Sequence, residues 1–323
     1  MERGTMVQRI LVSLGGNALG THERSLREMA DAVAAPIATL VQEGYELIFC
    51  HGNGPQVGAL QNAFGTKKHI NRFEAIYLAD SVAMTQGYMG YQLQNAIETE
   101  LRKRGNPTQV ATLVTRTLVD KNDPMFQNPT KPVGPFYTAE EAKELEELGK
   151  VMREDAGRGY REVVPSPIPV QIIESDAIRA LLEHKILVIA GGGGGIPVLD
   201  DDGRLASVDA VIDKDYVSAE IAIETDCDLL VILTGVESVY TGFNTEHQQK
   251  LTDVTPEDVR KYADCGEFAP GSMLPKISAA AQFVESKPRR RALITSLETL
   301  VEGLEGKTGT WITQQSGSES KGL

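Results

Sequence analysis

The chain has 323 residues, of which 41% are hydrophobic and 24% are charged, and it contains 31 glycines and 15 prolines. This is the composition of a folded, soluble protein, and the length is enough for about two core-forming units. Its 32 basic and 45 acidic residues give a formal net charge of −13, which argues against a general nucleic-acid binder and against adhesion to anionic membranes. Any phosphorylated substrate therefore needs locally concentrated positive charge.

The cysteines and the apolar runs predict a cytoplasmic protein with no membrane partner. Cys50, Cys227 and Cys265 lie far apart and form no C-x-x-C pair, which is typical of reduced thiols in the cytosol. No apolar run approaches the ~18–20 residues that cross a bilayer. The short apolar stretch near the N-terminus leads directly into Gly-Gly-Asn, which fits a first strand better than a signal peptide.

Short apolar runs alternate with longer amphipathic segments almost from end to end. The runs predict strands at residues 10–14, 47–50, 110–114, 186–190, 229–234, 292–295 and 308–313. The amphipathic segments predict helices at residues 25–43, 74–104, 170–183, 216–225, 256–264 and 275–285. This alternation predicts an α/β fold with a mainly parallel sheet whose two faces are both covered by helices.

One region interrupts the alternation. Residues 120–169 are rich in proline and glycine and contain one charged helix at 138–149, where Thr138 and Glu141 form a capping box. An excursion of this length between sheet elements predicts a lid or small subdomain. The tail at 314–323 consists mostly of Ser, Gly, Gln and Lys and is predicted to be disordered.

Glycine-dense segments follow three of the predicted strands, at residues 14–17, 51–55 and 191–195. Ligands of an open parallel sheet bind beyond the carboxyl ends of its strands. Glycine lets the backbone approach an anion closely, and a following helix N-terminus adds partial positive charge. Each loop by itself could equally be a plain tight turn, but three at the same topological position favour an anion site.

The two common phosphate-binding motifs do not account for these loops. The chain has no G-x-x-x-x-G-K-[ST], so it is not a P-loop protein. Residues 191–195 satisfy part of G-x-G-x-x-G, but Ile196 and Pro197 follow, and proline favours an extended segment over the helix that a Rossmann turn must open. A dehydrogenase is therefore disfavoured.

Three lysines lie in stiff sequence contexts rather than among ordinary polar residues. Lys131 is flanked by prolines in Asn-Pro-Thr-Lys-Pro, Lys214 lies between Asp213 and Asp215, and Lys276 lies in the first turn of a predicted helix. Most lysines simply belong to a solvated face, and the Asp-Lys-Asp triplet could be a helix N-cap with local ion pairing. The neighbouring carboxylates keep Lys214 protonated, as a phosphate ligand must be.

Histidine and cysteine offer no competing site. Of five histidines only His51 is next to one of the glycine segments, and no H-E-x-x-H, G-x-S-x-G or paired-cysteine zinc pattern is present. Cys50 falls in an apolar strand, where a cysteine is more often packed than reactive. The sequence therefore predicts no protein metal site.

These segments, in this order, resemble the carbamate kinases of the amino acid kinase superfamily. The matching segments are residues 14–18, 51–58, 84–87, 119–124, 128–134, 154–159, 163–167, 192–198, 210–215, 232–234, 268–273 and 294–297. The first glycine motif indicates only the superfamily. Asn-Pro-Thr-Lys-Pro at 128–132, Asp-Ala-Gly-Arg-Gly at 155–159 and Gly-Ser-Met-x-Pro-Lys at 271–276 look specific to carbamate kinase.

The resemblance implies a three-layer αβα sandwich with a central, mostly parallel sheet and a small protruding lid subdomain. Residues 1–190 would form the carbamate and carbamoyl phosphate half, with the lid inserted at about 120–169. Residues 191–313 would form the nucleotide half, followed by the tail at 314–323. The family reaction is reversible, converting ATP and carbamate into ADP and carbamoyl phosphate, and it often runs toward ATP in arginine fermentation. The family also implies a homodimer and Mg²⁺ carried mainly by the phosphates of ATP or ADP.

The family match also assigns roles to residues. Lys131 would hold carbamoyl phosphate from the lid, Lys214 would stabilise the transferring phosphoryl group, Asp215 would orient Lys214, and Lys276 would lie on the nucleotide phosphates. The residues expected to surround the carbamate and the phosphoryl group, with glycines as backbone donors, are Gly15, Gly16, Asn17, Gly52, Asn53 and Gly54. The residues expected to bind the nucleotide are Gly192, Gly193, Gly194, Asp213, Thr234, Tyr240 and Met273. Carbamate is already an oxyanion, so positioning and charge neutralisation are nearly all that the protein needs to supply.

Two departures from the family pattern bear on the site. Gly191 adds a fifth glycine to a run of four and is expected only to loosen the turn. Residues 241–246 lack the Asn-Tyr/Phe-Gly-Lys-Pro pattern common at the adenine and ribose edge.

Two other functions stay open. A superfamily kinase acting on another carboxylate would give Lys131 no role. A catalytically silent nucleotide-binding regulator would be expected to lack Lys131, Lys214 or Lys276, and all three are present.

Overall fold

The computed structural model describes residues 8–15, 25–65, 77–155 and 157–315, and its centre is an eight-stranded sheet with the strand order β15-β17-β16-β12-β1-β2-β9-β3. The pairings from β16 through β12, β1, β2 and β9 to β3 are parallel, β17 pairs antiparallel with β16, and β15 pairs parallel with β17. The strands are β15 (Asp253–Val254), β17 (Thr310–Ile312), β16 (Arg291–Ser296), β12 (Leu229–Thr234), β1 (Arg9–Leu14), β2 (Glu46–His51), β9 (Leu187–Ile189) and β3 (Val110–Thr112). The predicted mainly parallel sheet is confirmed.

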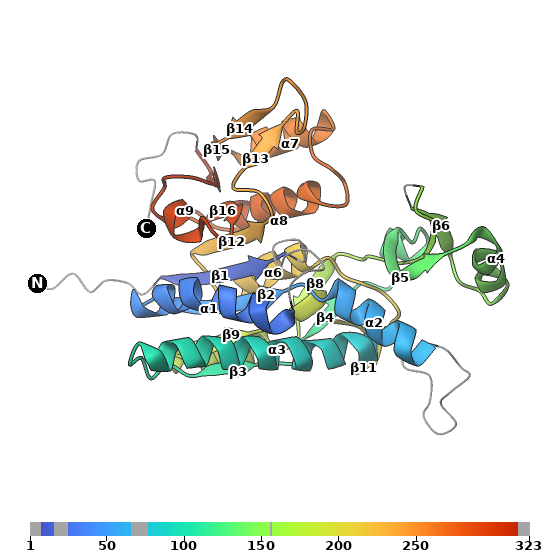
Figure 1. The fold of residues 1–323 in the computed structure, drawn as a ribbon, viewed down its shortest axis with the longest axis horizontal. Coiled ribbons are helices and arrows are strands. Elements are labelled where there is room, and N and C mark those ends of the chain that lie inside the picture. The colour runs from blue at the N-terminus through green and yellow to red at the C-terminus, as the bar shows by residue number, and fades with distance from the viewer. Residues whose placement is uncertain (1–7, 16–24, 66–76, 156, 316–323) are drawn as a thin grey trace, which may run out of the picture.

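Helices cover both faces of this sheet, so the predicted three-layer fold is also confirmed (Figure 1). Strand β1 shows why: alternate side chains point to opposite faces, and Ile10 and Val12 join one apolar cluster while Leu11 joins the other. The helices of the Ile10 face are α1 (Leu26–Gln42), α3 (Leu78–Lys103) and α9 (Leu300–Leu304). Those of the Leu11 face are α5 (Ser175–Glu183), α6 (Lys214–Glu224), α7 (Pro256–Asp264) and α8 (Met273–Glu285). No helix within the described ranges is long and apolar enough to cross a membrane.

Some elements differ from the sequence expectation. The helix predicted at 170–183 is wrong at its start, because residues 169–172 pair with β4 as a strand and the helix begins at Ser175. The glycine segment after β2 opens a helix, α2 (Gly54–Gly65), that was not predicted. A second sheet and a hairpin were also not predicted. Their strands are β11 (Arg204–Ser207), β10 (Ile196–Asp201), β4 (Arg116–Val119) and β8 (Pro169–Ile172), with β13 (Val239–Thr241) and β14 (Gln249–Leu251) in the hairpin.

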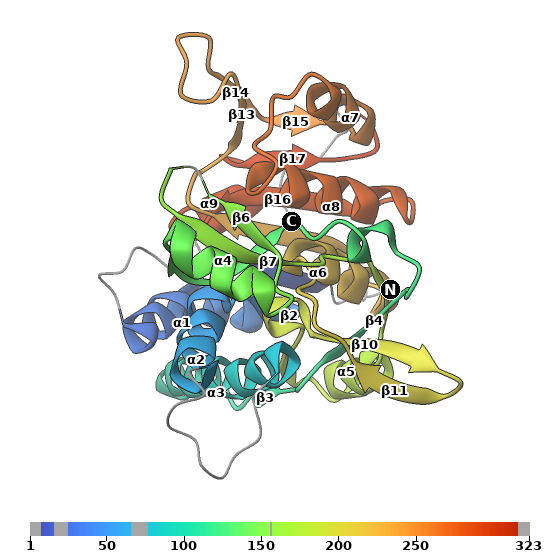
Figure 2. The same ribbon diagram turned by 90° about the vertical axis from the view of Figure 1, so that its right-hand side faces the viewer.

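A small subdomain projects from the body of the molecule (Figure 1) and faces the viewer in Figure 2. It lies within the proline- and glycine-rich stretch 120–169 and contains helix α4 (Ala139–Glu147), which begins with the predicted capping box of Thr138 and Glu141. Its sheet has the order β5-β7-β6 and is antiparallel. The strands are β5 (Lys131–Tyr137), β6 (Met152–Glu154) and β7 (Tyr160–Val164).

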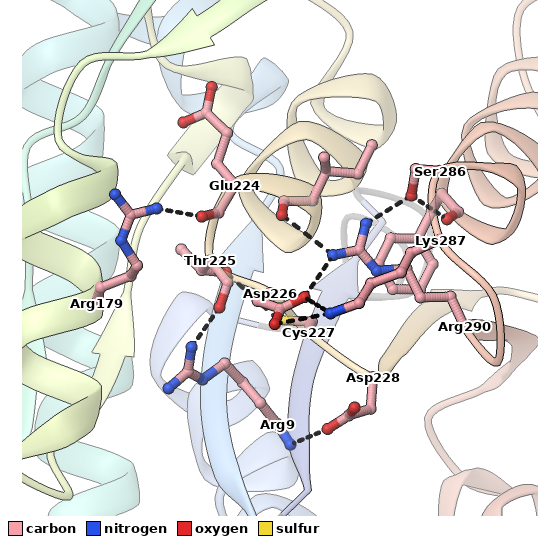
Figure 3. A network of polar contacts seen from close by, with 12 residues as sticks. Arg9, Arg179, Glu224, Thr225, Asp226, Cys227, Asp228, Ser286, Lys287 and Arg290 are labelled. Carbon is pink, nitrogen blue, oxygen red and sulfur yellow. Dashed lines mark hydrogen bonds and ion pairs between the residues drawn. The ribbon is translucent and has the colours of Figure 1, made fainter.

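Helix α6 lies at the centre of the Leu11 face and ends against three arginines. Its last carbonyl groups accept hydrogen bonds from side chains of three different elements. The pairs are Arg290 with Ile223 at 3.2 Å, Arg179 with Glu224, and Arg9 with Thr225 (Figure 3). Positive side chains satisfy the free carbonyls and complement the dipole at a helix C-terminus. The end of α6 opposite Lys214 is therefore held in place.

Two glutamates one turn apart on α6 make the stability of the fold depend on pH. Burial, together with the charge of Glu224, raises the pKa of Glu220 to about 7, and burial also raises the pKa of Glu224. A carboxyl whose pKa is raised on folding favours the folded state at low pH, and this contribution is lost as the pH rises from the unfolded value through 7. We expect Glu220→Gln to raise the melting temperature at pH 8 more than at pH 5.

Thermal unfolding at the two pH values measures this difference. Glu183→Gln, a substitution of an exposed residue of α5, is the matched control. It should leave the melting temperature unchanged at both pH values. An equal effect of Glu220→Gln at pH 5 and pH 8 would contradict the assignment.

Candidate active site

The carboxyl ends of β1, β2 and β12 lie side by side, and the segments that follow them border a cavity of about 260 Å³. Its remaining walls come from the N-termini of α2, α6 and α8 and from the start of β5 in the subdomain. The cavity brings together the three predicted lysines and most of the predicted substrate residues. Those that line it are Gly15, Gly52, Asn53, Gly54, Lys131, Asp213, Lys214, Asp215 and Lys276. Gly16 and Asn17 lie outside the described residues.

A buried carboxylate holds two of the lysines. Asp215 is 2% exposed, and its two oxygens accept from Lys214 Nζ at 2.5 Å and from Lys276 Nζ at 2.9 Å. Burial alone would raise the pKa of Asp215, but the two ammonium groups hold it below its usual range. Burial would likewise lower the pKa of Lys214, but the charge of Asp215 raises it. Lys214 and Asp215 therefore favour their charged forms, and Asp215 binds both lysines through its two oxygens.

The third lysine reaches the same cavity from the subdomain. Lys131 Nζ, at the start of β5, lies 2.8 Å from Asp213 Oδ2. Asp213 is also the N-cap of α6, because its Oδ1 accepts from the backbone N–H of Asp215 at 3.0 Å. The N-cap interpretation of the Asp-Lys-Asp triplet is thus correct, and the same triplet lies in the cavity wall.

The glycines predicted to donate backbone N–H groups to the anion differ in whether those groups already have a partner. The N–H of Gly15 donates to the carbonyl of Leu233 and that of Gly52 to the carbonyl of Leu14, both at 3.1 Å. These two glycines continue the pairing of the parallel strands, so the expectation that their N–H groups bind the anion is wrong. Gly54 differs because it begins α2, and the first N–H groups of a helix have no partner within it.

Asn53 is fixed beside the cavity by close packing against Gly193. Its Nδ2 donates to Thr85 Oγ1 at 2.8 Å. Gly193 has a φ of +67°, and a Cβ there would lie 2.1 Å from Asn53 Nδ2, so only glycine fits. Of the three glycines predicted for the nucleotide, Gly193 lines this cavity beside Asn53, while Gly192 and Gly194 are buried behind it.

The fifth glycine does not loosen the turn, contrary to expectation. Gly191 has a φ of +68°, and a Cβ there would lie 2.6 Å from the side chain of Ile221 on α6. A glycine at this position lets the turn at 191–195 pack directly against α6. It therefore allows a closer contact between the turn and the helix, not a looser one.

Neither His51 nor Cys50 can act as an acid, base or nucleophile here. Burial lowers the pKa of His51 to about 4, and its Nδ1 lies 3.1 Å from the carbonyl of Gly52. The imidazole is therefore neutral at physiological pH and donates to that carbonyl. Cys50 is buried, donates to the carbonyl of Gly191, and has a pKa raised by burial, so the prediction of a packed cysteine is confirmed.

A second cavity of about 360 Å³ adjoins the first, since Thr234 and Ser272 line both. Tyr240 and Met273, predicted for the nucleotide, line this second cavity. Phe243 and Glu267 line it too, and sequence reasoning missed both. The available signal for Phe243 was a large aromatic residue in the segment 241–246, where turn-forming residues surround it.

The two cavities together suit a ligand with one anionic end and one flat, apolar end. Among the residues that the structure describes, the first is lined by three lysines and two aspartates, a net charge of 3 − 2 = +1, and by helix N-termini that favour anions. The second has mostly aromatic and aliphatic walls, as small-molecule pockets usually do. Within the described residues, no group of three His, Cys, Asp or Glu side chains is placed to hold a metal ion.

Comparison with known proteins agrees with this geometry. A model of the amino acid kinase family matches residues 8–296. The chain is 47% identical to the carbamate kinase-like protein YqeA of Escherichia coli, covering 96% of this chain and all of that protein. It is 47% identical to the carbamate kinase of Pyrococcus furiosus, covering 95% and 99%. The solved structure of carbamate kinase from Giardia lamblia bound to AMP-PNP has a TM-score of 0.87 and 38% identity, covering 95% and 98%.

The buried carboxylate can be tested by a change that keeps its shape. In Asp215→Asn, two ammonium groups remain close together without their counter-charge, so we expect a loss of about 3–5 kcal/mol in the free energy of unfolding near pH 7. The loss should shrink as the pH rises from 7 into the alkaline range, because a buried ammonium group that lacks its counter-charge releases its proton more easily. Denaturant unfolding across this pH range measures both effects, with Asp209→Asn, an exposed carboxylate, as the control. A loss that does not depend on pH would contradict the charge argument.

Proposed function

The chain belongs to the amino acid kinase family and, within it, to the carbamate kinases, and we propose that it catalyses reversible phosphoryl transfer between ATP and carbamate. The observation that carries this proposal is the convergence of Lys131, Lys214 and Lys276 on one cavity, next to an apolar cavity of nucleoside size. In the forward direction a carbamate oxygen bonds to the γ-phosphorus and the bond to the β,γ-bridging oxygen breaks. The products are carbamoyl phosphate and ADP.

No general base is needed because the attacking carbamate oxygen already carries negative charge. The protein's task is to bring one anion onto another and to stabilise the charge of the transferring phosphoryl group. In our assignment Lys214 contacts that group, Lys276 contacts the nucleotide phosphates, and Asp215 fixes the distance between the two lysines. Removing one preorganised contact of this kind typically lowers turnover by about 10²–10³.

We further propose that Mg²⁺ binds together with the nucleotide, held by its phosphate oxygens. Asp213 and Asp215 are both paired with lysines, and the described residues contain no carboxylate cage. The bound cation supplies additional charge neutralisation on the phosphates.

The alternatives fit this site less well. A kinase for another carboxylate gives no role to Lys131, whereas here Lys131 reaches the cavity from the subdomain. A silent nucleotide-binding regulator has no need for three lysines in one cavity, and all three line it.

A coupled assay that follows ATP formation from ADP and carbamoyl phosphate tests the proposed activity. We expect turnover that requires Mg²⁺. Absence of ATP formation at micromolar enzyme with Mg²⁺ present would contradict the proposed function.

Lys131 can be used to test whether carbamoyl phosphate and ADP are bound by different residues of the cavity. Because it belongs to the subdomain and pairs with Asp213 rather than with Asp215, we expect Lys131→Ala to impair the use of carbamoyl phosphate by about 10²-fold while ADP affinity stays nearly unchanged. Steady-state kinetics and a direct ADP titration measure the two effects. Lys143→Ala, an exposed lysine on α4 of the same subdomain, is the control, and an equal loss of ADP affinity in Lys131→Ala would contradict the assignment.

A homodimer is the proposed assembly. Helix α3 and its N-cap residue carry four large exposed side chains, Tyr77, Met84, Tyr88 and Tyr91, at spacings of seven, four and three residues, which place them on one face of the helix. The edge strand β3 lies next to this helix. We propose that a second copy of the chain covers this face.

Tyr88→Glu combined with Tyr91→Glu should then convert the dimer to a monomer, as measured by light scattering after size-exclusion chromatography. Phe136→Glu, an exposed aromatic residue of the subdomain, should leave the dimer intact. A wild-type protein that is monomeric at micromolar concentration would contradict this assembly.

We also propose a cytoplasmic location and a place in arginine metabolism. The location rests on the three cysteines, which are all unpaired and typical of a reducing compartment. The metabolic role follows from the reaction, since an enzyme that consumes carbamoyl phosphate needs one that supplies it. An arginine deiminase or carbamoyltransferase gene alongside would support this role, and its absence in related genomes would count against it.

A further inference from the structure

A serine lies within the otherwise apolar end of strand β1. Because side chains of a strand alternate between the two faces of the sheet, Ser13 lies on the same face as Leu11, where α6 packs. Ser13 is fully buried, and its neighbours in the sheet are Cys50 on β2 and Ile232 on β12. A buried hydroxyl is costly unless it makes hydrogen bonds, so the partners of Ser13 show what it contributes.

Ser13 contacts a lysine of the first cavity. Lys214 Nζ donates to Ser13 Oγ at 3.0 Å and to Asp215 Oδ1 at 2.5 Å. An ammonium group has three N–H donors, and these two acceptors leave one N–H for an anion in the cavity that Lys214 lines. Because the three N–H bonds have a fixed geometry, two fixed acceptors also determine where the third N–H points.

A second buried serine holds the hydroxyl group of Ser13. Ser218 lies one turn after Lys214 on α6 and is also fully buried. Its Oγ donates to the carbonyl of Lys214 at 2.7 Å and lies 2.9 Å from Ser13 Oγ. Each hydroxyl has a single proton, and that of Ser218 goes to the carbonyl, so the proton between the two hydroxyls comes from Ser13. Ser13 thus accepts from Lys214 and donates to Ser218.

The other groups around Lys214 include one strong counter-charge. The titratable and charged groups that face Lys214 are Asp213 and Asp215 on α6 with its N-cap, Lys276 on α8, and Cys50 and His51 on β2. Burial lowers the pKa of His51 to about 4 and raises that of Cys50, so both are neutral near pH 7. Ser13 is therefore a neutral acceptor that assists Asp215 in holding a buried ammonium group.

Building on the proposed kinase function, we propose that Ser13 is a positioning residue for phosphoryl transfer, which directs the third N–H of Lys214 toward the transferring group, and that Ser218 fixes the hydroxyl of Ser13. Asp215 supplies the counter-charge, and Ser13 supplies the second fixed acceptor. The lining of the cavity includes Lys214 but neither serine, so both serines act through the lysine.

Turnover and substrate affinity separate positioning from binding. In Ser13→Ala we expect kcat to fall about tenfold, the effect of losing one hydrogen bond to a charged group, while the KM values for ADP and carbamoyl phosphate change less than about twofold. Ser218→Ala should lower kcat less, and it should add little to Ser13→Ala in the double variant because both serines belong to one network. Ser175→Ala, a change at another buried serine, is the control and should leave kcat unchanged. An unchanged kcat in Ser13→Ala would overturn the proposal.

A second measurement follows Lys214 itself and needs no activity. Loss of an acceptor lowers the pKa of an ammonium group, and only the neutral amine reacts with acetic anhydride. In competitive labelling at pH 9, read by mass spectrometry, we expect Lys214 to react about tenfold faster in Ser13→Ala, which corresponds to a pKa lower by about one. Lys276 is the internal control, because it binds Asp215 but not Ser13. An equal increase at Lys276 would indicate a loosened site and overturn the positioning role.

The labelling result keeps this proposal distinct from the proposed function. If the wild type makes no ATP but the labelling of Lys214 alone rises in Ser13→Ala, the kinase assignment fails and the role of Ser13 in fixing Lys214 stands. If the wild type is active and the labelling of Lys214 is the same in Ser13→Ala, the kinase assignment stands and the positioning role is overturned.

Discussion

The buried charge of Asp215 is the interaction on which the rest of the site depends. One carboxylate, 2% exposed, is held between Lys214 from α6 and Lys276 from α8. Such a charge is tolerated in an interior only when it is paired and hydrogen-bonded. Because each lysine stems from the N-terminus of a different helix, the ion pair also fixes how α6 and α8 approach each other. At the far end of α6, the three arginines on its last carbonyls hold that helix in place (Figure 3).

This arrangement explains how a chain with a net charge of −13 can carry out phosphate chemistry. The overall charge governs long-range encounters with large polyanions, which it disfavours. The binding of a small phosphate depends instead on charges within a few ångströms, where the described lining of the cavity has one more lysine than aspartate and a helix N-terminus at Gly54. For a small phosphate, the fixed positive charges of the cavity therefore matter more than the net charge of the whole chain.

Sequence reasoning succeeded where a local pattern determines the structure. The alternation of apolar residues located strands such as β12 at its exact bounds, and stiff contexts singled out Lys131, Lys214 and Lys276, which meet in one cavity. It failed where the structure of a segment is determined by its pairing with a segment distant in the sequence. The N–H groups of Gly15 and Gly52 are used by neighbouring strands, and residues 169–172 become a strand only because β4 lies beside them. Phe243 was missed because its place in the wall of the second cavity depends on how hairpin β13–β14 folds back onto the sheet.

The two aspartates that flank Lys214 show how one short segment can serve two purposes. Asp215 is buried and bound to two lysines, so releasing it would leave two charges uncompensated, and it acts as a permanent part of the site. Asp213 caps α6 through one oxygen and holds Lys131 through the other, with the lysine side chain 34% exposed. This ion pair is partly buried, with Asp213 16% exposed, whereas Lys214 and Asp215 are 11% and 3% exposed. Lys131 from the subdomain is therefore held by one partly exposed pair, whereas the two lysines of the body share a buried carboxylate, and this difference agrees with our proposal that Lys131 binds the smaller substrate.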